Sequence, residues 1–363
     1  MMRRLEVRLD EGMRSTDKRY GCLFVPPGYC SRAVPHGRIA SIAVVVGLCL
    51  LLSGCAARGK TPALTNVPFE LNGWKFAHSD GYQITTEHYE IYTTLTDRVL
   101  VDALPQALES AYRFYHELAP NAREPKQRMP MYLFARRGEW ANFTRRFGPR
   151  LSQTLLKVRQ GGYTQQGVVV AEYVTHAVTF PLMAHEGFHQ FLYYCAYPRV
   201  PAWLNEGLAV YCEGQRWTAD GLAEFDPWLN PQRRNMLAEL ILRKELFSLD
   251  ELLRMNAGHV VGGSSYKISA YYGQVWALML FLREGQEGKY AEGFQRLLAA
   301  LGRDDIETYA RAYHAQVGGE AYNFGRDLFC NFISNDLATV EREYRQFMND
   351  RILGDEPAKK KRR

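Results

Sequence analysis

The sequence is poor in several features that would assign it to a common class of protein. It has only seven cysteines in 363 residues, three of them before residue 50. It contains no G-x-S-x-G motif of the serine hydrolases and no G-x-G-x-x-G dinucleotide motif. None of the later cysteines has neighbours typical of a catalytic thiol. These absences argue against a serine or cysteine hydrolase and against a dinucleotide-dependent enzyme.

The charge of the chain is nearly balanced. There are 45 Lys and Arg and 39 Asp and Glu, and residues 1–54 hold eight of the basic and four of the acidic residues. Five more basic residues form the end of the chain, at 359–363. The remaining body is slightly acidic, which argues against nucleic acid as a partner. We interpret the basic end as a solvated tail; attraction to anionic lipid or cell-wall polyanions is the less favoured alternative.

An apolar run at residues 39–52 follows a polar and basic leader. The run has 14 residues and is interrupted only by Ser41 and Gly47. This length is too short for a mature transmembrane helix and is typical of the core of a secretory signal. An uncleaved anchor is the alternative. In either case the rest of the chain is expected outside the cytoplasm.

The run ends in Leu52-Ser53-Gly54-Cys55, which resembles a bacterial lipoprotein signal. The resemblance implies that residues 1–54 are a signal peptide, that Cys55 carries lipid and that residues 55–68 form a linker. Because position 56 is not aspartate, it also implies an outer membrane, with the protein facing the periplasm or the exterior. We therefore expect a cell-envelope protein anchored to the membrane by lipid on Cys55. The leader is long for such a signal, and Met13 offers a later start.

Residues 182–190 contain the motif H-E-x-x-H. On a helix, residues four apart lie on the same face, so His185 and His189 can both aim an imidazole nitrogen at one metal ion. Glu186 lies about 100° further around the helix, where it can reach a metal-bound water and act as general base. Pro181 suits the first turn of this helix. The alternative is a pair of core histidines with ordinary hydrogen bonds.

A second short helix is expected over residues 201–211, and it also opens with a proline. Glu206 lies 17 residues after His189, which allows one helix to end and the next to return past the metal. A catalytic zinc takes three protein ligands and keeps a fourth position open. We therefore expect one Zn²⁺ per chain, held by His185, His189 and Glu206.

The wording H-E-G-F-H-Q followed by W-L-N-E-G-L-A resembles the paired motifs of the gluzincin zinc metallopeptidases, above all their peptidase MA-like relatives. The resemblance covers about residues 161–214. It implies an α+β fold, with a small mixed N-terminal lobe whose edge strand lies beside the active-site helix and a mainly helical C-terminal lobe, as in a thermolysin-like catalytic domain. It also implies hydrolysis of peptide or protein substrates, with zinc-bound water as nucleophile and Glu186 as general base. The substrate-amine motif of the large aminopeptidases is missing, so aminopeptidase specificity is not implied.

The resemblance suggests two further features of the cleft. The β-branched strand at residues 167–174 stands in the place of the edge strand that pairs with an extended substrate; a plain core strand is the alternative. Residues 270–282 are apolar nearly all round, as in a central buried helix. Within them, Tyr272 matches a family tyrosine that faces the cleft and stabilises the oxyanion. For Tyr272 a purely structural role is the favoured alternative.

Hydrophobic periodicity divides the body into two lobes. An α+β lobe is expected at residues 69–180 and a helical zinc-binding catalytic lobe at residues 181–350, followed by a basic, disordered tail at residues 351–363. A strand or hairpin is expected at 82–94 and a strand at 129–134. Helices are expected at 102–118, 140–147, 233–244, 249–255, 269–283, 290–301, 306–314 and 337–348.

A non-catalytic binding or scaffold lipoprotein on the same fold is the alternative function, with the metal serving as a structural pin. The presence of Glu186 favours the enzyme, because a three-ligand structural site does not need that carboxylate. Export to an oxidising compartment permits disulfides. Three thiols cannot all pair, however, and no bridge is assigned among Cys195, Cys212 and Cys330.

Overall fold

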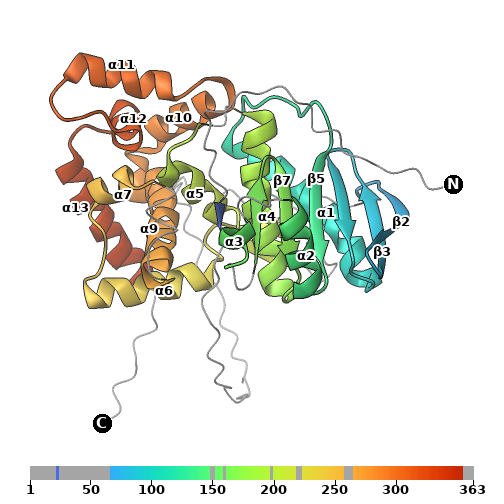
Figure 1. Cartoon of the computed structure of the whole chain (residues 1–363). Helices are drawn as coiled ribbons and strands as arrows, with labels where there is room; N and C mark the ends of the chain where they lie inside the picture. Colours follow the sequence, from blue (N-terminus) through green and yellow to red (C-terminus); the bar gives the residue numbers. More distant parts are fainter. Residues whose placement is uncertain are drawn as a thin grey trace, which may run out of the picture.

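The computed structural model describes residues 22–23, 66–147, 152–157, 161–196, 199–217, 223–256 and 265–354 (Figure 1). These residues form a mixed α+β fold, as expected from the sequence. A β-sheet and a group of helices lie side by side as two halves, with helices α4 and α5 near their junction. The expected lipidation site Cys55, nearly all of the expected signal peptide and residues 355–363 of the expected tail lie outside the described residues. Residues 351–353, which were expected in the disordered tail, belong to a short helix over Asn349–Leu353. Within those described, no helix is both long enough and apolar enough to cross a bilayer.

The main sheet has parallel strands in its middle and antiparallel strands on both sides. Strands β4, β5 and β7 are parallel to one another, while β2 and β3 extend one side and β6 and β1 the other. In sheet order the strands are β1 (Cys22–Leu23), β6 (Gly162–Gln165), β7 (Val168–Glu172), β5 (Met129–Phe134), β4 (Tyr89–Thr93), β3 (Ser79–Thr85) and β2 (Glu70–Phe76). The strands expected at 82–94 and 129–134 are confirmed; the first is the β3–β4 hairpin.

The predicted edge strand is wrong, because β7 lies between β5 and β6 inside the sheet. Gln166 and Gly167 form a two-residue turn with positive φ values of 51° and 75°. Positive φ at both central residues is typical of the tight turns that join the two strands of a β-hairpin. This turn lets Gly162–Gln165 fold back as a further strand. The short segment has little strand patterning, so its sequence did not reveal it. The outer edge of β6 in turn pairs with the two residues of β1, which belong to the expected signal peptide.

Helices cover both faces of the sheet. Alternate residues of β7 divide between two cores: Val169 and Ala171 pack with α1 and α4, while Val170 faces α2 and α3. The helices of this half are α1 (Arg98–Leu118), α2 (Arg137–Phe147), α3 (Ser152–Leu155) and α4 (His176–Cys195). The parallel middle of the sheet is therefore covered on both faces, as parallel strands require, whereas β2 at one edge has no buried residue.

The second half is helical and surrounds α9 (Ser265–Glu284), which packs against α5, α6, α10 and α13. Residues 270–282 of α9 are buried throughout, so a central helix is confirmed. The other α-helices are α5 (Ala202–Tyr211), α6 (Pro231–Arg243), α7 (Leu249–Arg254), α10 (Ala291–Arg303), α11 (Glu307–Val317), α12 (Phe324–Phe332) and α13 (Leu337–Met348). Two short helical segments complete this half: the 3-10 helix η1 (Gly285–Gly288) and the π-helix η2 (Asn349–Leu353). Helix α12 and the small β8–β9 hairpin (Gln215–Trp217 and Ala223–Phe225) were not expected from the sequence.

Candidate metal centre

Helix α4 carries the H-E-x-x-H motif and begins earlier than predicted. Thr175 is its N-cap, and the Thr175 carbonyl accepts a hydrogen bond of 2.8 Å from Thr179 N. Pro181 therefore lies inside the helix, and the prediction that it opens the helix is wrong. Because proline has no N–H, the Ala177 carbonyl loses its partner four residues on. Pro181 is the sixth residue of α4, so the helix tolerates the loss of one interior hydrogen bond.

The underside of α4 is fitted to α1 and to the sheet. The Tyr115 hydroxyl of α1 donates a 2.6 Å hydrogen bond to Ala184 O. A Cβ at Gly187 would lie only 2.6 Å from that hydroxyl, so this position of the motif has no room for a side chain. Gln190 Nε2 donates to Pro130 O and Gly167 O, both at 2.7 Å. These contacts fix the rotation of α4, and with it the direction of its two histidines.

Three side chains converge where α4 meets α5. His185 Nε2 lies 3.3 Å from His189 Nε2 and 3.5 Å from Glu206 Oε2, and His189 Nε2 lies 3.7 Å from the same oxygen. Zinc bonds of 2.0–2.1 Å in tetrahedral geometry place neighbouring ligand atoms about 3.3 Å apart. All three residues are buried. Their atoms thus fit one zinc ion with only a small adjustment, and a buried group that can hold a metal ion is confirmed.

The other nitrogen of each imidazole has a partner of its own. His185 Nδ1 lies 2.9 Å from Glu213 Oε1, and His189 Nδ1 lies 3.0 Å from Asn205 Oδ1. Because both partners are acceptors, each Nδ1 carries the proton and each Nε2 can offer its lone pair to a metal.

The pKa values of the two histidines differ because their partners differ. Burial opposes charge on His185, but hydrogen bonds to Glu206 and Glu213 overcome it and raise the pKa of His185 to about 9. Burial lowers the pKa of His189 to about 4. His189 is therefore neutral at pH 7, whereas His185 must release a proton when it binds a metal.

Glu186 lies beside the three converging residues and is not one of them. The Thr164 hydroxyl on β6 lies 2.8 Å from both Oε2 and the backbone carbonyl oxygen of Glu186, which share its single proton. The buried Oε1 of Glu186 accepts no hydrogen bond from the residues that the structure describes. Burial raises the pKa of Glu186 to about 7. This carboxylate can accept or give up a proton near neutral pH.

Tyr272 of α9 lies next to the same site. Its ring centroid is 6.0 Å from that of His185, and the guanidinium carbon of Arg233 lies 5.0 Å from the Tyr272 ring. The tyrosine is buried. Its proximity agrees with the expected place of this residue, and its role in catalysis stays a prediction.

Sequence reasoning missed five residues around the site: Thr164, Asn205, Glu213, Asn230 and Arg233. Asn205 directly precedes Glu206 on α5, and Glu213 follows the end of that helix by two residues, so helical periodicity did not place it. Thr164, Asn230 and Arg233 come from β6 and the start of α6, and no local pattern links them to the motif.

Cys195, Cys212 and Cys330 are buried free thiols. Burial raises the pKa of each thiol. They are therefore structural residues, and no disulfide bond joins any two of the three.

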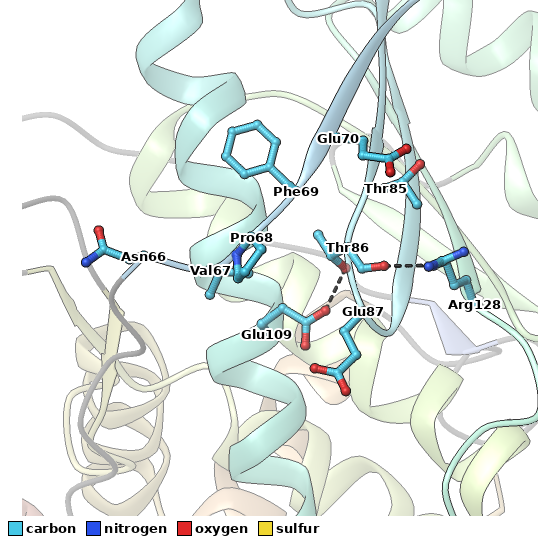
Figure 2. A pocket seen from close by; sticks show the side chains of 10 residues that line it. All are labelled: Asn66, Val67, Pro68, Phe69, Glu70, Thr85, Thr86, Glu87, Glu109 and Arg128. Carbon is cyan, nitrogen blue, oxygen red and sulfur yellow. Dashed lines mark hydrogen bonds between the residues drawn. The ribbon is translucent and has the colours of Figure 1, made fainter.

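A pocket of about 570 Å³ lies near the start of β2, at the edge of the sheet away from β6 and the metal site (Figure 2). Inside it, Thr86 Oγ1 donates to Glu109 at 2.6 Å and Arg128 Nε donates to Thr86 O at 2.7 Å. Its lining residues are Asn66, Val67, Pro68, Phe69, Glu70, Thr85, Thr86, Glu87, Glu109 and Arg128. None belongs to the metal site, which is recognised by its converging donor atoms.

No protein-family model matches the chain, and no curated protein matches it either.

Residues 54–61 have the sequence G-C-A-A-R-G-K-T, which matches the G-x-x-x-x-G-K-[ST] motif of a phosphate-binding loop. That loop requires a strand before it and a helix after it. The segment lies outside the described residues, and Pro62 follows it immediately. Because its first residues also belong to the expected lipoprotein signal, we propose no nucleotide-binding role for this segment.

Proposed function

We propose that this protein is a zinc-dependent peptidase of the gluzincin type, with a thermolysin-like catalytic domain. The observation that carries the proposal is the buried triangle of His185 Nε2, His189 Nε2 and Glu206 Oε2, with sides of 3.3–3.7 Å. A separate carboxylate, Glu186, stands beside this triangle. Two imidazoles and one carboxylate form a donor set typical of catalytic zinc.

The three ligands would hold the metal from two helices. His185 and His189 come from α4 and Glu206 comes from α5. When bound there, Zn²⁺ lowers the pKa of a water molecule and polarises the scissile carbonyl.

Glu186 is the proposed general base and acid. Its Oε1 takes a proton from the attacking water as the water oxygen bonds to the carbonyl carbon. When the C–N bond breaks, the same oxygen returns the proton to the leaving amine nitrogen. Thr164 holds Oε2 at 2.8 Å and so turns Oε1 toward the reaction. A pKa near 7 suits a group that must first accept and then donate.

The substrate we propose is an extended peptide that lies along the outer edge of β6. This edge is able to pair with an antiparallel segment, since it does so with Cys22 and Leu23. Cys22 lies opposite Thr164, the residue whose hydroxyl reaches Glu186. A peptide in that place would have its backbone next to the general base, and main-chain pairing would hold it without selecting particular side chains.

We further propose that lipid on Cys55 anchors the enzyme in the cell envelope. Mass spectrometry of membrane-extracted protein is expected to find Cys55 as a lipidated N-terminus. An intact Met1 or Met13 terminus in that fraction would refute the anchor.

Glu186→Gln provides the test of the function, on protein incubated with a broad peptide library with and without a zinc chelator. Wild-type protein is expected to cleave peptides and to stop when the metal is removed. Glu186→Gln keeps the shape of the side chain but cannot take up the proton, so it should retain zinc and lose hydrolysis. If fully zinc-loaded wild-type protein cleaves no peptide, the proposed peptidase activity is rejected and the non-catalytic scaffold function is favoured.

A further inference from the structure

The proposed hydrolysis uses Glu186 and the three metal ligands and gives Glu213 no part, yet this carboxylate is buried beside the metal site. Glu213 lies two residues after the end of α5 and is 5% exposed. A buried carboxylate is costly unless its oxygens are paired. Its partners therefore indicate what it does.

Both oxygens of Glu213 are fully used. Oε1 lies 2.9 Å from His185 Nδ1 and accepts from Arg233 Nη2 at 2.8 Å. Oε2 accepts from Arg233 Nε at 3.0 Å and from Asn230 Nδ2 at 2.8 Å. The paired bonds from one planar guanidinium fix the plane of the carboxylate as well as its position.

Arg233 and Asn230 are themselves held by the start of α6. Asn230 is the N-cap, and its Oδ1 accepts from Arg233 N at 3.2 Å while its Nδ2 reaches Glu213. Arg233 is 1% exposed, and its guanidinium lies 5.0 Å from the Tyr272 ring of α9. The hydrogen bonds that hold Glu213 therefore come from the N-cap and first turn of α6, and Tyr272 of α9 packs against the arginine that donates them.

A buried ion pair is seldom more stabilising than apolar residues of similar volume. The stability of the fold alone gives little reason for this arrangement. Its geometry, however, sets which nitrogen of His185 carries the proton and where the ring points.

We infer that Glu213 is the positioning residue of the metal ligand His185, and that Arg233 and Asn230 hold Glu213 in place for this purpose. Glu213 keeps the proton on Nδ1 and aims Nε2 at the point where His189 and Glu206 converge. Replacing such a partner of a metal-ligating histidine typically weakens metal affinity by roughly 10–100-fold. The inference rests on the proposed metal site but not on peptidase activity.

The chain offers a matched control in Glu109. This glutamate is also 5% exposed, and its Oε2 lies 2.6 Å from a histidine Nδ1, that of His88. His88 does not belong to the group that can hold a metal. Glu109→Gln therefore removes the same charge from the same kind of pair, away from the metal site.

The experiment compares zinc dissociation constants of the purified wild type, Glu213→Gln, Glu213→Asp, Arg233→Lys and Glu109→Gln, measured by competition with a chelator. We expect Glu213→Gln to bind zinc roughly 10–100-fold more weakly and Glu109→Gln to match wild type. Glu213→Asp and Arg233→Lys keep the charges and should fall between the two. Thermal unfolding of the metal-free proteins shows which variants fold; if Glu213→Gln does not, Glu213→Asp and Arg233→Lys carry the comparison.

Cobalt replacing zinc adds a readout of geometry. Its visible absorption should change in Glu213→Gln and stay as in wild type in Glu109→Gln. Zinc affinity within twofold of wild type in every folded Glu213 and Arg233 variant overturns the inference. A weakened affinity in a protein that cleaves no peptide supports the inference and removes only the proposed function, whereas a wild type that binds no zinc overturns both.

Discussion

Two histidine and glutamate pairs in this protein each contain a buried glutamate, but they differ in what surrounds the histidine. In one, His185 Nδ1 lies 2.9 Å from Glu213, and in the other His88 Nδ1 lies 2.6 Å from Glu109. Each glutamate accepts further hydrogen bonds, from Arg233 and Asn230 in the first pair and from Thr86 Oγ1 and the His88 amide in the second.

The difference lies at the second ring nitrogen. His185 Nε2 faces His189 and Glu206 at 3.3 and 3.5 Å. His88 Nε2 instead faces Glu124, 3.7 Å away, whose side chain is 73% exposed. Across the described parts of the chain, His185 is the only one of the four residues that belongs to a group of three converging donors. A carboxylate behind a histidine therefore orients the ring, while a metal site also needs the convergence of separate helices.

The largest expected effect is loss of the metal. His189→Ala or Glu206→Ala removes one of three ligands, so either variant should lose the single bound zinc. His88→Ala should keep it, because its ring takes no part in the convergence. Elemental analysis after removal of loose metal decides the matter, and stoichiometric zinc in both ligand variants would show that the site is elsewhere.

Next in size is the effect of Glu186→Gln on turnover. General acid and base catalysis contributes about 10²–10⁴ in rate, so kcat should fall at least about a hundredfold on any cleaved peptide. Zinc content and Tm should stay near wild type, since the amide fills the same space. Tyr272→Phe should have a smaller effect if the phenol donates to the oxyanion and almost none if it only packs. Unchanged hydrolysis by Glu186→Gln would reject the proposed base.

A smaller effect is expected for Thr164→Val, which removes the hydroxyl that holds Glu186 Oε2 at 2.8 Å. One such hydrogen bond is worth about 1 kcal/mol, so kcat should fall by roughly five- to tenfold with KM and zinc content little changed. Thr164→Ser restores the hydroxyl and should restore the rate. Equal loss in both variants would assign the effect to packing of β6.

The smallest effect concerns the second pair and its dependence on pH. Burial opposes charge on His88, but hydrogen bonding and the charge of Glu109 raise the pKa of His88. Burial also opposes charge on Glu109, but hydrogen bonds from His88 and Thr86 lower the pKa of Glu109. The glutamate's contribution is lost as the pH falls through its lowered pKa, and the histidine's contribution is lost as the pH rises through its raised pKa.

The pair should therefore stabilise the protein most between the ordinary pKa values of the two groups, about pH 4.3 to 6.5. Thermal unfolding of wild type and Glu109→Gln should show a larger difference in Tm at pH 5.5 than at pH 8.5. A difference that grows toward pH 8.5 would contradict this account of the pair.

Much of the fold was predictable because its elements are long and periodic. Helix α1 and strand β5 were expected from their apolar spacing, and the central helix α9 from its apolar residues on all sides. The errors arose where the pattern is short or a proline misleads. Strand β6 has four residues and depends on the turn at Gln166 and Gly167. Helix α4 begins five residues before Pro181, because a proline inside a helix removes one backbone hydrogen bond and need not end the helix.

The relation of His185, His189 and Glu186 follows from the sequence alone, because helical periodicity places residues four apart on one face and their neighbour beside it. The sequence also indicated Glu206, through the distance along the chain that a turn and a returning helix require. The contacts of Thr164 with Glu186, and of Arg233 and Asn230 with Glu213, became evident from the folded structure and not from the sequence. These contacts join β6 and α6 to α4 and α5. Their formation depends on how separate elements pack, which local periodicity does not encode.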